Sequence, residues 1–125
     1  MKATSLKIVW TLFVAVLSGI AVAGGRYADP PMNLAEVYQA TQVALDAAKA
    51  GNKDGALEAS LKGRKLAVTS FKEKSTMPMQ VAASGLKEAI AALDSGKVDG
   101  AVAPLEHTIE KLKEEVEYYK KEGKM

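Results

Sequence analysis

The sequence predicts an all-α protein, an antiparallel up-down-up-down four-helix bundle built from two similar αα-hairpins. Near the C-terminus, apolar side chains recur every three or four residues, which places them on one face of a helix. These residues are Val102, Leu105, Ile109, Leu112, Val116 and Tyr119. The segments AKAGNKDGAL (48–57) and LDSGKVDGAV (93–102), 45 residues apart, each contain a glycine, a short turn and Asp-Gly-Ala. Because hairpins of equal length pack most simply side by side, and no segment alternates as a strand does, a four-helix bundle follows.

The N-terminus has the three-part pattern of a secretory signal. Lys2 and Lys7 precede an apolar run over 8–20, and small residues follow at 21–23, the positions that signal peptidase reads. We predict a signal peptide over 1–23, cleavage after Ala23, and export to the periplasm. The alternative is an uncleaved membrane anchor, for which the run is shorter than the ~20 apolar residues of a span. Residues 24–32 are expected to form a flexible leader, and 33–122 the bundle domain.

The net charge argues against two classes of partner, and the absence of cysteine excludes disulfides and a lipoprotein anchor. Loss of residues 1–23 removes two lysines, which leaves 15 basic against 15 acidic side chains. A neutral surface of mixed charge does not attract nucleic acid or an anionic membrane, so neither is expected as a partner. The chain has no cysteine, which excludes disulfides and a lipoprotein anchor. Export without disulfides favours the bacterial periplasm.

The first helix is expected to begin after Asn33, with Glu36 as its capping-box partner, and to end at Gly51. Its inner face is predicted to contain Leu34, Val37, Thr41, Ala44 and Ala48.

The second helix is expected to run from an Asp54 cap to about Lys74. Gly55 and Gly63 each weaken it by about 1 kcal/mol relative to alanine. Its inner face is predicted to contain Leu57, Leu61, Arg64, Val68 and Phe71.

In the second hairpin, Thr76 is expected to cap the third helix, and Pro78 to occupy its first turn, where a missing N–H costs nothing. Gly96 ends this helix and Asp99 caps the fourth, in which Pro104 predicts a slight kink or a late start. The inner face of the third helix is predicted to contain Met79, Ala83, Leu86, Ile90 and Leu93.

Two groups of side chains are candidate metal ligands. His107, the only histidine, falls on the water-facing side of its helix, where it is either an ordinary surface residue or a weak ligand with Glu110. Met77 and Met79 offer thioethers, which suit Cu(I), although Met79 also fits the core. An up-down bundle places the central connection and both chain ends at one pole, where Met32 and Met125 could add sulfur.

No catalytic constellation is present in the sequence. It contains no EF-hand loop, P-loop, HExxH or CxxCH motif, and no serine has a histidine placed to activate it. We therefore predict that the protein is not an enzyme and has no cofactor-binding residues.

The turns followed by ALEASLKGRKLA and LEHTIEKLKEE, with the 45-residue duplication, resemble the small metal-binding protein family over residues 35–115. This resemblance implies an exported, metal-binding four-helix bundle of the bacterial periplasm. Family members repeat histidines along these helices. The corresponding positions here are Ala59, Lys97, Pro104 and Lys111. The resemblance therefore implies weak or vestigial metal binding, and the thioethers of Met77 and Met79 make copper the first candidate, with another divalent ion as the alternative.

The expected bundle and the Gly-Lys-Val turn at 96–98, before the last helix, also resemble four-helix b-type cytochromes, which bind haem through a methionine on helix one and a histidine late in helix four. Met32 is close to the first position, but Val116 stands at the second, so haem is not expected.

The leading hypothesis is a small exported periplasmic bundle of the metal-binding type. The alternative is a protein-interaction or scaffolding module. Its docking surface would include Gly55, Gly63 and Arg64, because small residues let another helix approach closely.

Overall fold

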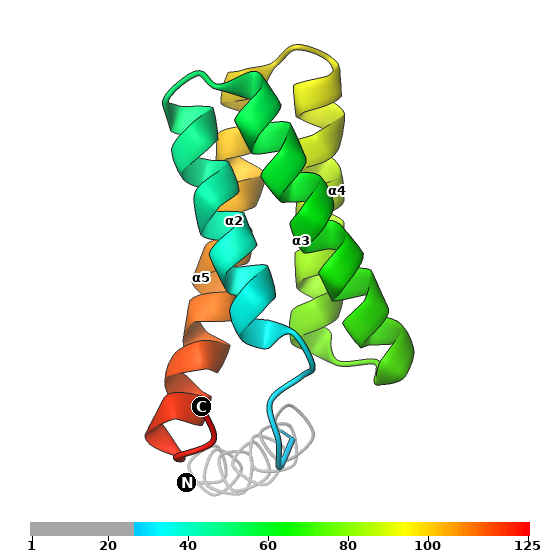
Figure 1. Cartoon of the computed structure of the whole chain (residues 1–125), viewed down its shortest axis with the longest axis vertical. Helices are drawn as coiled ribbons and strands as arrows, with labels where there is room; N and C mark the ends of the chain where they lie inside the picture. Colours follow the sequence, from blue (N-terminus) through cyan, green and yellow to red (C-terminus); the bar gives the residue numbers. More distant parts are fainter. Residues whose placement is uncertain (1–26) are drawn as a thin grey trace, which may run out of the picture.

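The structure is a computed structural model that describes residues 27–125, and in this range it contains four helices and no strand (Figure 1). The helices are α2 (Leu34–Lys49), α3 (Lys53–Glu73), α4 (Met77–Asp94) and α5 (Val98–Lys121). Each packs antiparallel against the next, and α5 closes the ring against α2. The predicted fold class is thereby confirmed. The predicted signal peptide lies outside the described residues. Of the helices described, none has the length and apolar character that a bilayer span requires.

The two short turns of the hairpins have the same backbone geometry, as the duplication predicts. Gly51 and Gly96 adopt φ values of 75° and 77°, which a side chain disfavours. The Gly51 N–H donates to the Ala48 carbonyl at 3.0 Å. The N–H of the next residue, Asn52, donates to the Ala47 carbonyl at 2.8 Å. The Gly96 turn repeats both bonds, with Leu93 and Ala92 as acceptors. Both glycines therefore end their helices in Schellman motifs.

The helix caps differ from those expected. Asn33 makes no capping bond and instead donates from Nδ2 to the Leu66 carbonyl at 3.4 Å. The cap of α3 is Asn52, whose Oδ1 accepts from the Gly55 N–H at 3.0 Å, because the Schellman turn brings the chain into helix two residues early. Asp54 thus lies in the first turn of α3, where it complements the helix dipole.

The same correction applies to α5. Lys97 occupies its cap, and Asp99 lies in its first turn. Of the two outcomes predicted at Pro104, a slight kink or a late start, the late start is wrong, since α5 is continuous through this residue. Pro78 lies in the first turn of α4, as predicted, while Thr76 holds the cap position without a side-chain bond.

The core forms where α2, α4 and α5 were predicted to face inward. All five predicted inner residues of α2 are buried, as are Met79, Leu86 and Leu93 of α4, whereas Ala83 and Ile90 are only half-buried. The apolar face predicted for α5 also lies in the core. Four of its residues are buried, Leu105, Leu112, Val116 and Tyr119, and two are half-buried, Val102 and Ile109.

The predicted inner face of α3 is wrong by a rotation of about one residue. Leu61 is 50% exposed, and Leu57, Arg64, Val68 and Phe71 are only half-buried. The buried residues are Ala56, Ala59, Ser60, Gly63, Ala67 and Ser70. These small residues allow close packing, because a Cβ on Gly63 would lie 3.3 Å from the Ala40 Cβ and 3.2 Å from Leu86 Cδ1. Close packing of α3 against α2 and α4 therefore turns the face of α3 that has small side chains toward the core.

Candidate functional site

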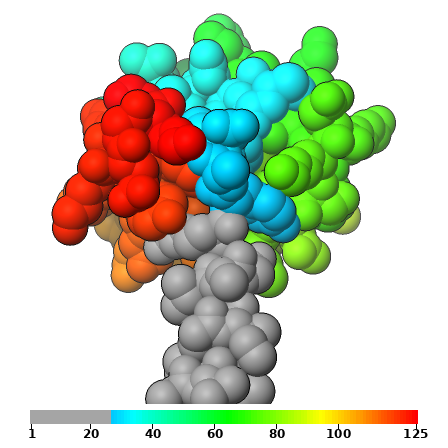
Figure 2. All heavy atoms as spheres, turned by 90° about the horizontal axis from the view of Figure 1, so that it is seen from below, coloured from blue at the N-terminus to red at the C-terminus, as the bar shows by residue number. Residues whose placement is uncertain are grey.

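Both ends of the described chain meet at the pole where α3 joins α4 (Figure 2). The buried Tyr119 hydroxyl accepts from the Tyr27 N–H at 3.2 Å and donates to the Tyr27 carbonyl at 3.0 Å. Lys74 Nζ lies 4.4 Å from the centre of the Tyr27 ring, and Lys124 Nζ lies 3.9 Å from Asp29 Oδ1. These contacts hold the described part of the leader, from Tyr27 onward, against the bundle.

The two methionines proposed as copper ligands point in different directions. Met77 is the first residue of α4 and is 57% exposed, whereas Met79 is fully buried in the core. Positions two apart on a helix differ by about 200°, so the pair does not converge on one ion. Met32 and Met125 are also exposed.

His107 and Glu110 are both exposed, as predicted for the outer face of α5. His107 lines a hollow of about 400 Å³ between α4 and α5, which Met77 and Glu88 also line. Glu110 is not among its lining residues. The structure therefore brings His107 to the same hollow as Met77, a pairing that the sequence analysis missed. From Tyr27 to the C-terminus, no three His, Cys, Asp or Glu side chains gather into a metal site.

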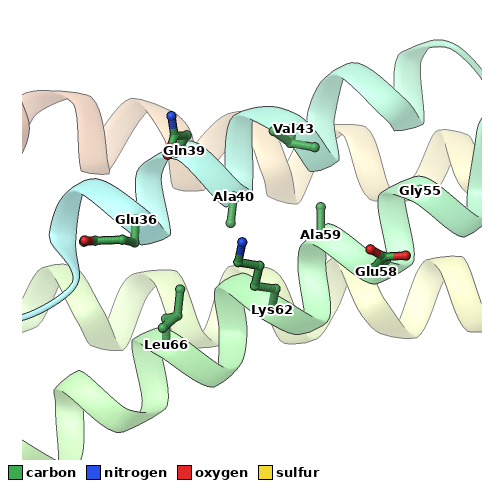
Figure 3. Close-up of a pocket in the computed structure, with 9 residues that line it drawn as sticks. All are labelled: Glu36, Gln39, Ala40, Val43, Gly55, Glu58, Ala59, Lys62 and Leu66. Atoms are coloured by element: carbon green, nitrogen blue, oxygen red, sulfur yellow. The ribbon is translucent and has the colours of Figure 1, made fainter.

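A larger groove, the α2–α3 groove, lies between α2 and α3 and has a volume of about 610 Å³ (Figure 3). Ala40 and Ala59 lie between the two helices at its floor. The residues that line it are Glu36, Gln39, Ala40 and Val43 from α2, and Gly55, Glu58, Ala59, Lys62 and Leu66 from α3. The small floor residues leave the space, and longer side chains form the two walls.

The walls of the α2–α3 groove offer both charge and apolar surface. Glu36 and Glu58 are acidic, and Lys62 lies between them along the groove (Figure 3). Within residues 27–125, none of these three side chains takes part in an ion pair. Val43 is 54% exposed on the α2 wall. The groove therefore has charges of both signs that make no ion pair within residues 27–125, beside an exposed apolar side chain.

The docking surface predicted on α3 differs from the α2–α3 groove that the structure contains. Gly55 lines it, but Gly63 faces the core against Ala40 and Leu86, and Arg64 is half-buried elsewhere on the helix. The α2 wall was missed, although Glu36, Gln39 and Val43 have the three- and four-residue spacing of one helix face.

Comparisons of the chain with protein-family models, characterised proteins and solved structures find no significant match. The resemblance to the small metal-binding protein family therefore stays a prediction.

Proposed function

We propose that the protein is a small exported helical bundle that acts by docking a protein partner in the α2–α3 groove. The observation that carries the proposal is the groove itself, with its small-residue floor and with wall charges that have no ion-pair partner among the described residues. A helix laid into a groove buries its apolar face and pairs charges along the rim, a common mode of recognition. The wall on α3, from Gly55 to Leu66, covers about three helical turns, which suits a short helix.

Photo-cross-linking from the groove tests this proposal. A photoreactive phenylalanine analogue at position 43 of the full chain, illuminated in the producing cell, should give a discrete protein adduct, because Val43 is exposed on the groove wall. The adduct is identified by mass spectrometry. The control places the same analogue at Lys113, an exposed α5 position away from the groove. Absence of an adduct at 43, or identical adducts from both positions, would contradict the docking function.

Metal binding is the second candidate, and one observation favours it. Met77, Glu88 and His107 all line the hollow between α4 and α5, with Met77 and Glu88 eleven residues, ~16 Å, apart along α4. A thioether suits Cu(I), whereas imidazole and carboxylate also accept Zn(II). Because these donors are spread along the hollow, a bound ion would contact only one or two of them, and its binding would be weak.

A metal titration measures this second function. If the hollow binds copper, Cu(I) in large excess should raise the melting temperature more than Zn(II) does, because the exposed thioether prefers the softer ion. Met77→Leu should remove the Cu(I) response, and His107→Ala should weaken it. Met79→Leu is the matched control, since Met79 is buried in the core. If neither ion changes the melting temperature, the metal hypothesis fails.

A further inference from the structure

We propose that the occupant of the α2–α3 groove is a second copy of this chain, related to the first by a two-fold axis parallel to the helices. This inference rests on the proposed docking function and specifies its partner. Such an axis places α2 of each copy over α3 of the other. Because α2 and α3 run antiparallel, the helices that meet across the interface are antiparallel too, as they are within the bundle.

Two of the three charged side chains on the walls, Glu36 and Lys62, fit this arrangement. Glu36 belongs to the α2 wall and Lys62 to the α3 wall, so the two-fold axis sets each over the wall that carries the other. Ala40 lies beside Gly63 and the two helices are antiparallel, so Glu36 is five residues, ~7.5 Å, from the level of Lys62. An extended lysine side chain covers that offset. The contact occurs twice by symmetry and uses side chains that have no ion pair within the described part of one copy.

The apolar surface fits as well. Val43 lies opposite Ala59 along the groove, and Gly55 leaves further space on the α3 wall (Figure 3). In the dimer, Val43 of each copy packs onto the Gly55–Ala59 segment of the other, which removes an exposed apolar side chain from water.

Net charge does not oppose this association. The chain after Ala23 carries 15 basic and 15 acidic side chains, so two copies do not repel each other strongly. A net charge near zero favours self-association.

Light scattering and sedimentation of the purified chain over a wide concentration range test the dimer. The unchanged protein should be dimeric at high concentration. Glu36→Lys and Lys62→Glu should each weaken the dimer about tenfold or more, because each puts like charges face to face. The double variant with both changes should restore it. Glu114→Lys and Lys113→Glu, exposed on α5, are the matched controls and should leave the dimer unchanged. Far-UV circular dichroism checks that every variant remains helical.

A monomer at all concentrations would overturn the dimer, and so would a dimer that the groove charges do not affect. If the double variant stays as weak as the single ones, the assigned pairing is wrong. Cross-linking from position 43 separates the two proposals. An adduct of twice the chain mass supports the dimer, whereas an adduct with another protein leaves the docking function standing and rejects the second copy as occupant. No adduct, together with a monomer, rejects both.

Discussion

Replacing Leu86 with alanine should lower the free energy of unfolding by about 3 kcal/mol, within the ~2–5 kcal/mol of such changes in a packed core. Leu86 has no exposed surface, and its Cδ1 lies 3.2 Å from where a Cβ on Gly63 would be. Alanine would leave a cavity between α3 and α4 that close-packed helices cannot readily fill. Urea unfolding followed by far-UV circular dichroism measures the loss, since the only tryptophan, Trp10, belongs to the predicted signal peptide.

Leu61→Ala is the matched control, because it is the same change on a side chain that is 50% exposed. Its expected cost is below about 1 kcal/mol. Equal losses at Leu61 and Leu86 would contradict the orientation of α3 and favour the inner face predicted from the sequence.

The sequence predicts the inner faces of α4 and α5 because large side chains mark them. Leu86 and Leu93 on α4, like Leu105 and Leu112 on α5, repeat at seven residues and are fully buried. On such helices, the position of the largest apolar side chains and the direction of the core coincide. The glycine stops at Gly51 and Gly96 are equally local signals, since only the turn itself requires φ above zero.

The orientation of α3 could not be predicted in the same way. Its buried face is made of alanine, serine and glycine, which give a weak hydrophobic signal, whereas Leu57, Leu61 and Phe71 dominate the periodicity. The deciding factor is the close approach of α3 to Ala40 and Leu86, a property of three helices together. One sequence segment does not contain that information.

For the candidate sites too, the sequence predicts what depends on one helix and does not predict what depends on two. Exposure of His107 follows from its position on one helix and was predicted correctly. The α2–α3 groove combines Val43 with Ala59 across a turn, and the hollow between α4 and α5 combines Met77 with His107. Each pairing depends on the register between two helices, which the turns set and the periodicity of one helix does not reveal.

Gly85→Ala should destabilise the bundle by about 2 kcal/mol, although alanine is the better helix former. A Cβ at Gly85 would collide with Thr108 Oγ1, and it would lie 3.4 Å from the Pro104 carbonyl oxygen. Thr108 cannot move freely, because its Oγ1 donates to that carbonyl at 2.8 Å and its side chain is buried. The substitution must therefore break this hydrogen bond or push α4 away from α5.

Two further variants identify the cause. Thr108→Ala removes the colliding oxygen, so the double variant Gly85→Ala, Thr108→Ala should lose less stability than the two single losses added together. Gly100→Ala is the control, because its nearest neighbours, the Ala92 and Lys97 Cβ atoms, would both lie 3.5 Å away, at ordinary contact distance. It should stabilise the protein by roughly 0.5–1 kcal/mol through helix propensity alone. If Gly85→Ala stabilises the protein as Gly100→Ala does, α4 and α5 do not cross as closely at Gly85 and Thr108 as the structure shows.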